Sequence, residues 1–143
     1  MSRYVIDTSA LLAYIENEDG AIEVEQLIID ALENQHTVFL SVVSCIEMFY
    51  VSLQEQGMAV ATERLQLLKR LPFVCEPLRD DLVETIGQIK ASHAMSFADC
   101  CIAGLAKQKR AILMHKDPEF EQIEDEIVQH KLPYNTANKA NKR

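Results

Sequence analysis

The chain has 143 residues, of which 48% are apolar and 25% are charged, as is typical of one globular domain. Its longest stretch without a charged residue covers positions 34–46, which is too short to cross a bilayer, and its first residues lack the apolar segment of a signal peptide. We therefore expect a cytoplasmic protein. The net charge is −8, and an acidic body argues against a broad basic surface for nucleic acid.

Short strands alternate with helices along the chain. In order, the pattern predicts a strand (3–6), two helices (8–15 and 21–33), a strand (37–43), two helices (44–56 and 59–71), a strand (73–75), two helices (80–92 and 96–109), a strand (111–115), a short helix (118–123) and a strand (127–129). This alternation predicts an α/β fold with a mainly parallel sheet. We expect one domain over residues 1–134 and a flexible, polar, basic tail over 135–143.

The cysteines and aromatic side chains are interpreted as packing residues. The four cysteines show no metal-binding spacing and lie in apolar contexts, so we expect them to be buried. Phe49, Tyr50 and Phe97 are predicted at core-facing helical positions and not as a platform for bases.

Four acidic residues are predicted at one edge of the sheet. Ligands of such folds bind outside the carboxyl ends of the strands. Asp7 directly follows the first strand, and Asp117 follows the strand at 111–115. The helix that carries Glu47 begins at the same edge, and so does the helix that carries Asp99. The topology therefore predicts that the four carboxylates converge.

Helix capping is the alternative explanation for each acid taken singly. The segments Ser44-Cys-Ile-Glu47 and Ser96-Phe-Ala-Asp99 fit the capping-box pattern, whereas Asp7 and Asp117 fit helix N-caps. Taken together, four acids at the edge where ligands bind favour a functional site.

A divalent cation is the natural partner of such a cluster. Two carboxylates about 5 Å apart repel by roughly 3 kcal/mol at an effective dielectric constant of about 20. An all-oxygen site suits Mg²⁺ or Mn²⁺, which can activate a water for attack on a phosphodiester. Thr8, Ser9 and Ser96 either support the acids or only cap helices, while His115 and Lys116 are interpreted as a structural or bystander histidine and a solvated loop charge.

Four segments, in order along the chain, resemble the motifs of PIN-domain proteins. They are Tyr4-Val-Ile-Asp-Thr-Ser-Ala-Leu-Leu, Ser44-Cys-Ile-Glu, Ser96-Phe-Ala-Asp-Cys-Cys-Ile-Ala and Leu113-Met-His-Lys-Asp-Pro-Glu-Phe. The resemblance covers about residues 4–134 and is strongest to the VapC-type toxin ribonucleases of type II toxin–antitoxin systems.

This resemblance implies a three-layer α/β/α sandwich and a Mg²⁺- or Mn²⁺-dependent endoribonuclease. Asp7 and Asp99 match the family's main metal ligands, Glu47 its third acid, and Asp117 its fourth. The family also implies a homodimer and a cognate antitoxin protein whose C-terminal segment enters the active-site groove. His115 stands where the family often has Thr or Ser, which places it beside the second-metal position or the substrate.

Two other classes remain as alternatives. One is a PIN-like domain that only binds RNA or a partner protein, although a binding module has no need of four mutually repelling acids. The other is a phosphoryl-accepting receiver domain, which would need adjacent acids after the first strand where this chain has Asp7 alone.

Overall fold

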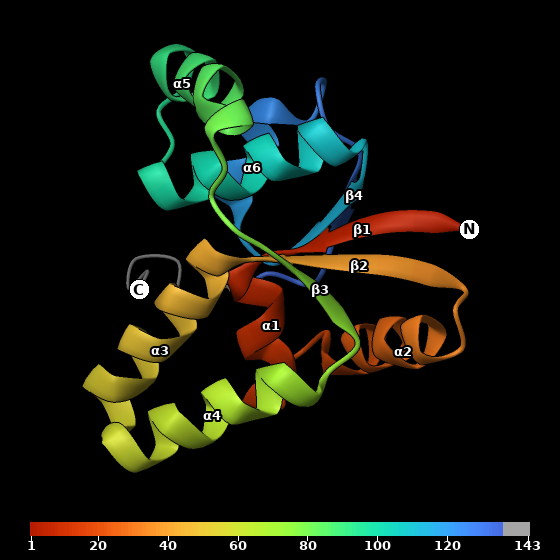
Figure 1. The fold of residues 1–143 in the computed structure, drawn as a ribbon, viewed down its shortest axis with the longest axis vertical. Coiled ribbons are helices and arrows are strands. Elements are labelled where there is room, and N and C mark those ends of the chain that lie inside the picture. The colour runs from red at the N-terminus through yellow and green to blue at the C-terminus, as the bar shows by residue number, and fades with distance from the viewer. Residues whose placement is uncertain (136–143) are drawn as a thin grey trace.

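The computed structural model describes residues 1–135, in which five short strands form one parallel sheet (Figure 1). The strands are β1 (Ser2–Ile6), β2 (His36–Ser41), β3 (Phe73–Glu76), β4 (Ile112–His115) and β5 (Gln129–Lys131), in the spatial order β3-β2-β1-β4-β5. Every neighbouring pair is parallel. The predicted parallel α/β architecture is therefore confirmed.

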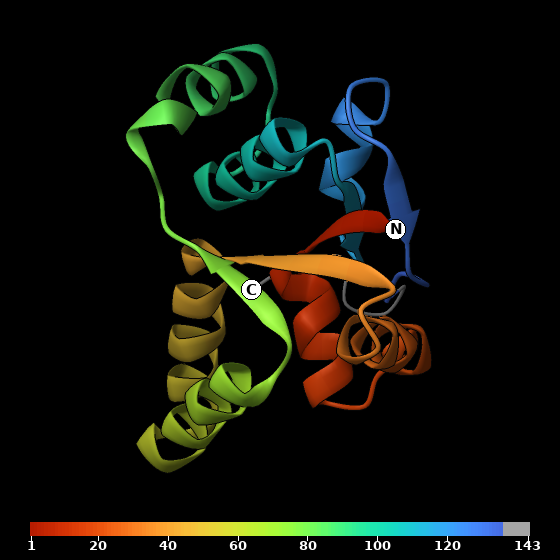
Figure 2. The ribbon, with the colours of Figure 1, turned by 45° about the vertical axis from the view of Figure 1, so that its right-hand side comes forward.

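Helices cover both faces of this sheet. They are α1 (Thr8–Ile15), α2 (Ala21–Leu32), α3 (Val42–Gln56), α4 (Met58–Arg70), α5 (Val83–Ser92) and α6 (Phe97–Lys109), with two 3₁₀ turns, η1 (Asp80–Leu82) and η2 (Pro118–Ile123). One core lies between the sheet and α5, α6 and η2; the other lies between the sheet and α1 to α4. Figures 1 and 2 show these layers, which form the α/β/α sandwich that the resemblance implied.

The strand order reverses between β1 and β4, which are hydrogen-bonded neighbours in the centre of the sheet. The chain leaves β1 through α1 on one face and leaves β4 through η2, which packs into the core of the other face. A crevice opens at the carboxyl ends of strands where connections diverge in this way. The fold therefore provides a ligand-binding position beside the residues that follow β1 and β4.

Predicted boundaries are wrong by two residues at two places in the chain. Helix α3 begins at Val42 and not at residue 44, because the Ser41 side chain accepts a hydrogen bond from the Val43 N–H and caps the helix. The last strand covers Gln129–Lys131 and not 127–129, because Ile127 is buried in the core and its N–H bonds the Ile123 carbonyl in a turn.

The packing interpretation of cysteines and aromatic residues is partly wrong. Cys100 and Cys101 are buried, whereas Cys75 is exposed on the edge strand β3. Tyr50 and Phe97 are 40% and 62% exposed, so neither is a core residue.

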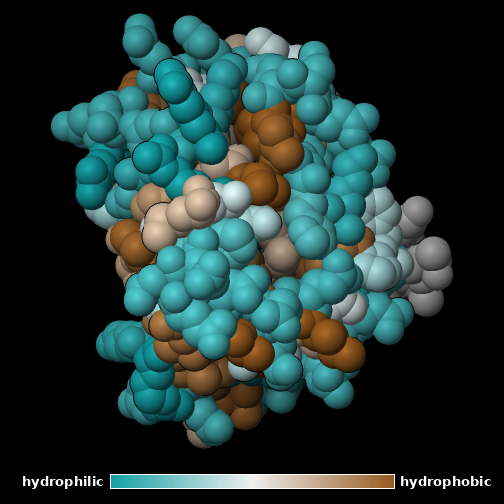
Figure 3. All heavy atoms as spheres, turned by 90° about the vertical axis from the view of Figure 1, so that its right-hand side faces the viewer, coloured by the Kyte–Doolittle hydropathy of each residue, from teal (hydrophilic) through white to brown (hydrophobic). Residues whose placement is uncertain are grey.

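No helix in residues 1–135 is long and apolar enough to span a bilayer. Figure 3 shows the side where the strands begin, which is mainly hydrophilic with separate small apolar patches. Apart from Asn135, the predicted tail at 135–143 lies outside the described residues.

Candidate metal-binding site

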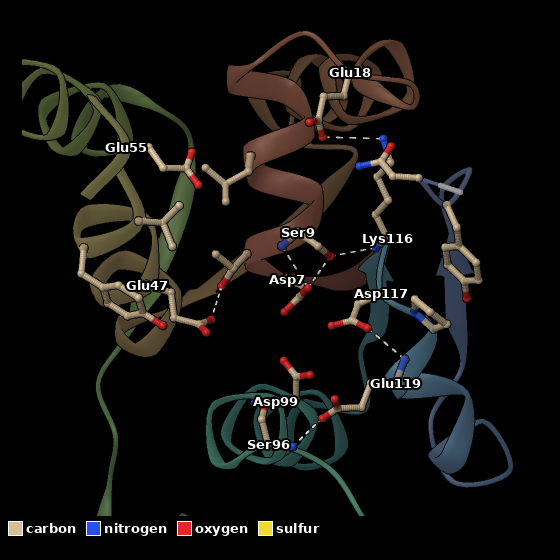
Figure 4. A pocket seen from close by; sticks show the side chains of 17 residues that line it. Asp7, Ser9, Glu18, Glu47, Glu55, Ser96, Asp99, Lys116, Asp117 and Glu119 are labelled. Atoms are coloured by element: carbon tan, nitrogen blue, oxygen red, sulfur yellow. Dashed lines mark hydrogen bonds and ion pairs between the residues drawn. The ribbon is translucent and has the colours of Figure 1, made fainter. Parts of the chain in front are cut away.

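A pocket of about 480 Å³ opens at the carboxyl ends of β1 and β4 (Figure 4). All four predicted acids line it, together with Thr8, Ser9 and Ser96 among the predicted supporting residues. Figure 4 shows Asp7, Asp99 and Asp117 pointing toward a common space, with Glu47 beside them. The tertiary structure therefore brings together side chains that are up to 110 positions apart in the sequence.

Asp7 lies at the bottom of this pocket. Its side chain is 2% exposed, and one carboxylate oxygen, Oδ2, accepts hydrogen bonds from the backbone N–H and the hydroxyl of Ser9. The Ser9 hydroxyl in turn accepts a hydrogen bond of 2.8 Å from the Lys116 N–H. The other oxygen of Asp7, Oδ1, is buried and has no hydrogen-bond partner among the described residues. Asp7 is thus both the N-cap of α1 and a pocket residue with one oxygen left for a ligand.

Glu47 comes from the second turn of α3, and its carboxylate is oriented from α1. The Thr8 hydroxyl donates a hydrogen bond of 2.7 Å to Glu47 Oε1. The predicted capping box from Ser44 to Glu47 is wrong, because Ser41 is the N-cap. Ser44 is instead inside the helix with a buried hydroxyl that has no partner among the described residues.

Asp99 comes from the first turn of α6. The Ser96 side chain accepts a hydrogen bond from the Asp99 N–H, so the predicted N-cap at Ser96 is confirmed. In a full capping box, the acid three residues later would accept from the N-cap N–H. Here Glu119 accepts from the Ser96 N–H instead. The Asp99 carboxylate is consequently directed into the pocket (Figure 4).

Among the described residues, acidic side chains outnumber basic ones around the pocket. Burial and the charges of Glu47 and Asp117 raise the pKa of Asp7, although the Ser9 hydrogen bonds oppose that rise. Burial and the charges of Asp7, Asp117 and Glu119 raise the pKa of Asp99. Burial also raises the pKa of Glu47. These raised pKa values mean that the charged form of each carboxylate is destabilised. A bound cation would stabilise the charged form.

The structural interpretation of His115 is confirmed, whereas the interpretation of Lys116 is wrong. His115 is fully buried and does not line the pocket; its Nδ1 accepts from the Asp117 N–H, and its Nε2 bonds Gln129. It therefore supports the backbone at Asp117 and is no bystander. Lys116 is not a solvated loop charge, because its ammonium is buried and donates to the carbonyl of Asp19.

Glu119 is a pocket residue that the sequence interpretation missed. It belongs to an acidic run, residues 117–126, that resembles a solvated surface. Its N–H bonds the Asp117 side chain, and its own carboxylate turns toward α6. The Asp-Pro-Glu segment was the available signal, because an N-cap followed by proline predicts a helical turn in which Glu119 is placed close to Asp117.

The donor set fits a hard divalent cation. Within residues 1–135, no three histidine, cysteine or acidic side chains lie close enough together to hold a metal ion as they are placed, so an ion would have to draw the carboxylates inward. The acids around the pocket offer only oxygen donors, and Asp7 Oδ1 is buried without a partner. Few carboxylate ligands with remaining positions for water suit Mg²⁺ or Mn²⁺. Asp7, Glu47, Asp99 and Asp117 are the residues that could hold such an ion.

Comparison with known proteins identifies relatives of this fold and sequence. The sequence model of the PIN domain matches residues 4–126. No curated protein sequence matches the chain.

Among solved structures, a chain of DNA-bound VapBC from Salmonella typhimurium has a TM-score of 0.75 at 18% identity, over 92% of this chain and 98% of that one. A chain of promoter-bound VapBC2 from Rickettsia felis has a TM-score of 0.73 at 13% identity, over 90% and 98%. VapC20 from Mycobacterium tuberculosis, a toxin that cleaves the sarcin–ricin loop, has a TM-score of 0.64 at 18% identity, over 83% and 93%.

Proposed function

This chain belongs to the PIN domain family, and from that premise we propose that it is a Mg²⁺- or Mn²⁺-dependent endoribonuclease and the toxin of a toxin–antitoxin pair. The observation that carries the proposal is the convergence of Asp7, Glu47, Asp99 and Asp117 on one pocket, in which an oxygen of Asp7 has no hydrogen-bond partner among residues 1–135. The mutual repulsion of four neighbouring carboxylates is costly, and a cation bound between them would offset it.

The residues of the pocket have separate tasks in this proposal. Asp7 and Asp99 hold the ion, with Asp7 fixed by its two hydrogen bonds from Ser9. Glu47 is held by Thr8 and lies beside them, where it can orient a water molecule. Asp117 supplies the fourth carboxylate. A bound divalent ion would neutralise phosphate charge and lower the pKa of the attacking water.

The charge of the pocket also supports a protein partner. Among the described residues that line it, acidic side chains outnumber basic ones, and the one lysine, Lys116, is buried and donates to the Asp19 carbonyl. We propose that a basic segment of an antitoxin occupies the pocket and excludes RNA, because opposite charge favours such an insertion.

We also propose that the protein is a homodimer. Light scattering should then give a mass of about twice 16.2 kDa.

Cleavage of a mixed RNA substrate tests the enzyme directly. Wild type, Asp7→Asn and the exposed control Asp125→Asn are each incubated with Mn²⁺ or with EDTA. We expect cleavage by wild type and Asp125→Asn only with Mn²⁺, and at least a 100-fold loss in Asp7→Asn, because a ligand of the ion is removed. Equal cleavage by wild type and Asp7→Asn would contradict the proposal.

A thermal measurement distinguishes the proposed metal-dependent enzyme from a domain that only binds RNA or a partner protein. An ion that binds the folded protein raises its melting temperature. We expect Mn²⁺ to raise the melting temperature of wild type and of Asp125→Asn but not that of Asp7→Asn. An RNA-binding domain without a metal site would show no rise in any of the three proteins.

A further inference from the structure

The 3₁₀ turn η2 holds the loop before α6 through two side chains. Glu119 accepts a hydrogen bond from the Ser96 N–H. Gln122 accepts one of 3.1 Å from the Ala94 N–H and donates one of 3.2 Å to the Ala94 carbonyl. Residues three apart in a 3₁₀ helix lie on the same face, so Glu119 and Gln122 act on the loop side by side. We call these two side chains the η2 clamp.

The same turn is fixed to Asp117. The Asp117 side chain caps η2 by accepting a hydrogen bond of 2.9 Å from the Glu119 N–H. Phe120 and Ile123 are fully buried and anchor η2 in the core. Asp117 and the η2 clamp therefore belong to one rigid segment.

The loop held by the clamp leads directly into the first turn of α6. The Cys100 N–H bonds the Ser96 carbonyl, and the Asp99 N–H bonds the Ser96 side chain. Any movement of Ser96 therefore moves Asp99. The clamp also supplies the acceptor for the Ser96 N–H that Asp99 itself would supply in a capping box, so the Asp99 carboxylate faces the pocket, where it interacts with Glu119.

We propose that Glu119 and Gln122 are positioning residues that set the separation of Asp99 from Asp117 and thereby the geometry of the cation site. The inference rests on the proposed function of the pocket as a metal site. Groups outside the ligands that orient them commonly change metal affinity by about 10- to 100-fold when they are removed.

Gln122→Ala tests the clamp without altering the charge of the site. Gln122 is exposed and does not line the pocket, so its loss removes no metal ligand. In the metal-free protein we expect faster amide hydrogen exchange at Ala94, Ser96 and the first turn of α6. We expect Mn²⁺ to bind about tenfold more weakly at a temperature where the variant is fully folded. Gln66→Ala, an exposed glutamine on α4, is the matched control and should match wild type in both measurements.

Glu119 provides a second, graded test. Glu119→Gln keeps an oxygen acceptor for the Ser96 N–H, whereas Glu119→Ala removes it. We expect exchange near the wild-type rate at Ser96 in the first variant and faster exchange in the second.

The outcomes separate this inference from the proposed function. Wild-type exchange rates in Gln122→Ala, or unchanged Mn²⁺ affinity despite faster exchange, would overturn the positioning role. If wild type itself bound no Mn²⁺, the proposed metal site would fail and the positioning role with it. Weaker Mn²⁺ binding in Gln122→Ala, with Gln66→Ala unchanged, would support both.

Discussion

The hydroxyl of Thr8 and the carboxylate of Glu47 form a hydrogen bond of 2.7 Å that joins the first turn of α1 to α3. Thr8 is adjacent to Asp7 in sequence, so one short segment fixes one acid through its backbone position and another through its side chain. The bond also favours the charged form of Glu47, against the burial that raises its pKa.

Replacing Thr8 tests whether this bond orients Glu47. We expect Thr8→Val, which keeps the shape of the side chain, to cost about 1 kcal/mol of unfolding free energy and to weaken Mn²⁺ binding by about tenfold. Thr8→Ser keeps the hydroxyl and should stay close to wild type in both. Urea unfolding and calorimetric titration provide the measurements. Equal Mn²⁺ affinity in the valine and serine variants would show that Glu47 needs no such support.

The raised carboxylate pKa values predict an unusual pH dependence for the metal-free protein. The pKa of Asp7 rises from 3.8 to about 7, and that of Asp99 also rises, in both cases chiefly through burial. The folded state therefore holds protons that the unfolded state releases. Stability from Asp7 is complete below about pH 4 and is lost as the pH rises through about 7, and stability from Asp99 falls in the same direction.

The substitution Asp99→Asn should remove part of the stability loss that occurs as the pH rises. We expect its metal-free melting temperature at pH 8 to exceed that of wild type by about 3 °C or more, because one pKa unit corresponds to about 1.4 kcal/mol. The difference should shrink toward pH 4. Asp125→Asn, on the exposed surface, should follow wild type throughout. A constant difference between Asp99→Asn and wild type at every pH would contradict this account.

We expect His115 to contribute to the stability of the fold and not to contact the substrate. Its Nδ1 accepts from the Asp117 N–H, and its Nε2 donates to Gln129 Oε1, because the Gln129 amide nitrogen is already bonded to the Phe120 carbonyl. We expect His115→Ala to lower the unfolding free energy by about 3 kcal/mol in urea. His130→Ala removes an exposed pair and should cost less than about 1 kcal/mol. Similar losses in both variants would contradict a supporting role.

Burial also lowers the pKa of His115, so folding favours the neutral form of this histidine. Its contribution to stability is present above its ordinary pKa of 6.5 and is lost as the pH falls below that value, opposite in sign to Asp7 and Asp99. His115→Ala should therefore lose less stability than wild type between pH 7 and pH 5.

Two serines near the start of α3 should respond differently to alanine. Ser41 caps the helix by accepting from the Val43 N–H, whereas the buried Ser44 hydroxyl has no partner among the described residues. We expect Ser41→Ala to cost about 1 kcal/mol of unfolding free energy. Ser44→Ala should cost less than about 0.5 kcal/mol or stabilise the protein, because it removes an unsatisfied polar group. A larger loss of unfolding free energy in Ser44→Ala than in Ser41→Ala, measured in urea, would indicate that Ser44 is the cap.

The N-cap of α3 illustrates what local sequence leaves open. The segment Ser41-Val-Val-Ser44 offers two capping residues, and the pattern from Ser44 to Glu47 resembles a capping box more closely. The pairing of β2 with β3 decides between them, because the register places Ser41 opposite Glu76 at the end of the ladder. The strand ends there, and the helix begins with the next residue.

The local sequence pattern predicts the alternation of strands and helices and the edge at which Asp7, Glu47, Asp99 and Asp117 gather. Hydrophobic patterning is local, and a parallel sheet places the carboxyl ends of its strands on one side. The packing of segments distant in sequence determines which acid accepts a hydrogen bond at the N-terminus of α6. Glu119 lies 23 positions from Ser96, and its local Asp-Pro-Glu signal places it close to Asp117 but says nothing of Ser96. The contact of Glu119 with Ser96 requires η2 to pack against the loop before α6, and the hydrophobic periodicity of the chain does not predict this packing.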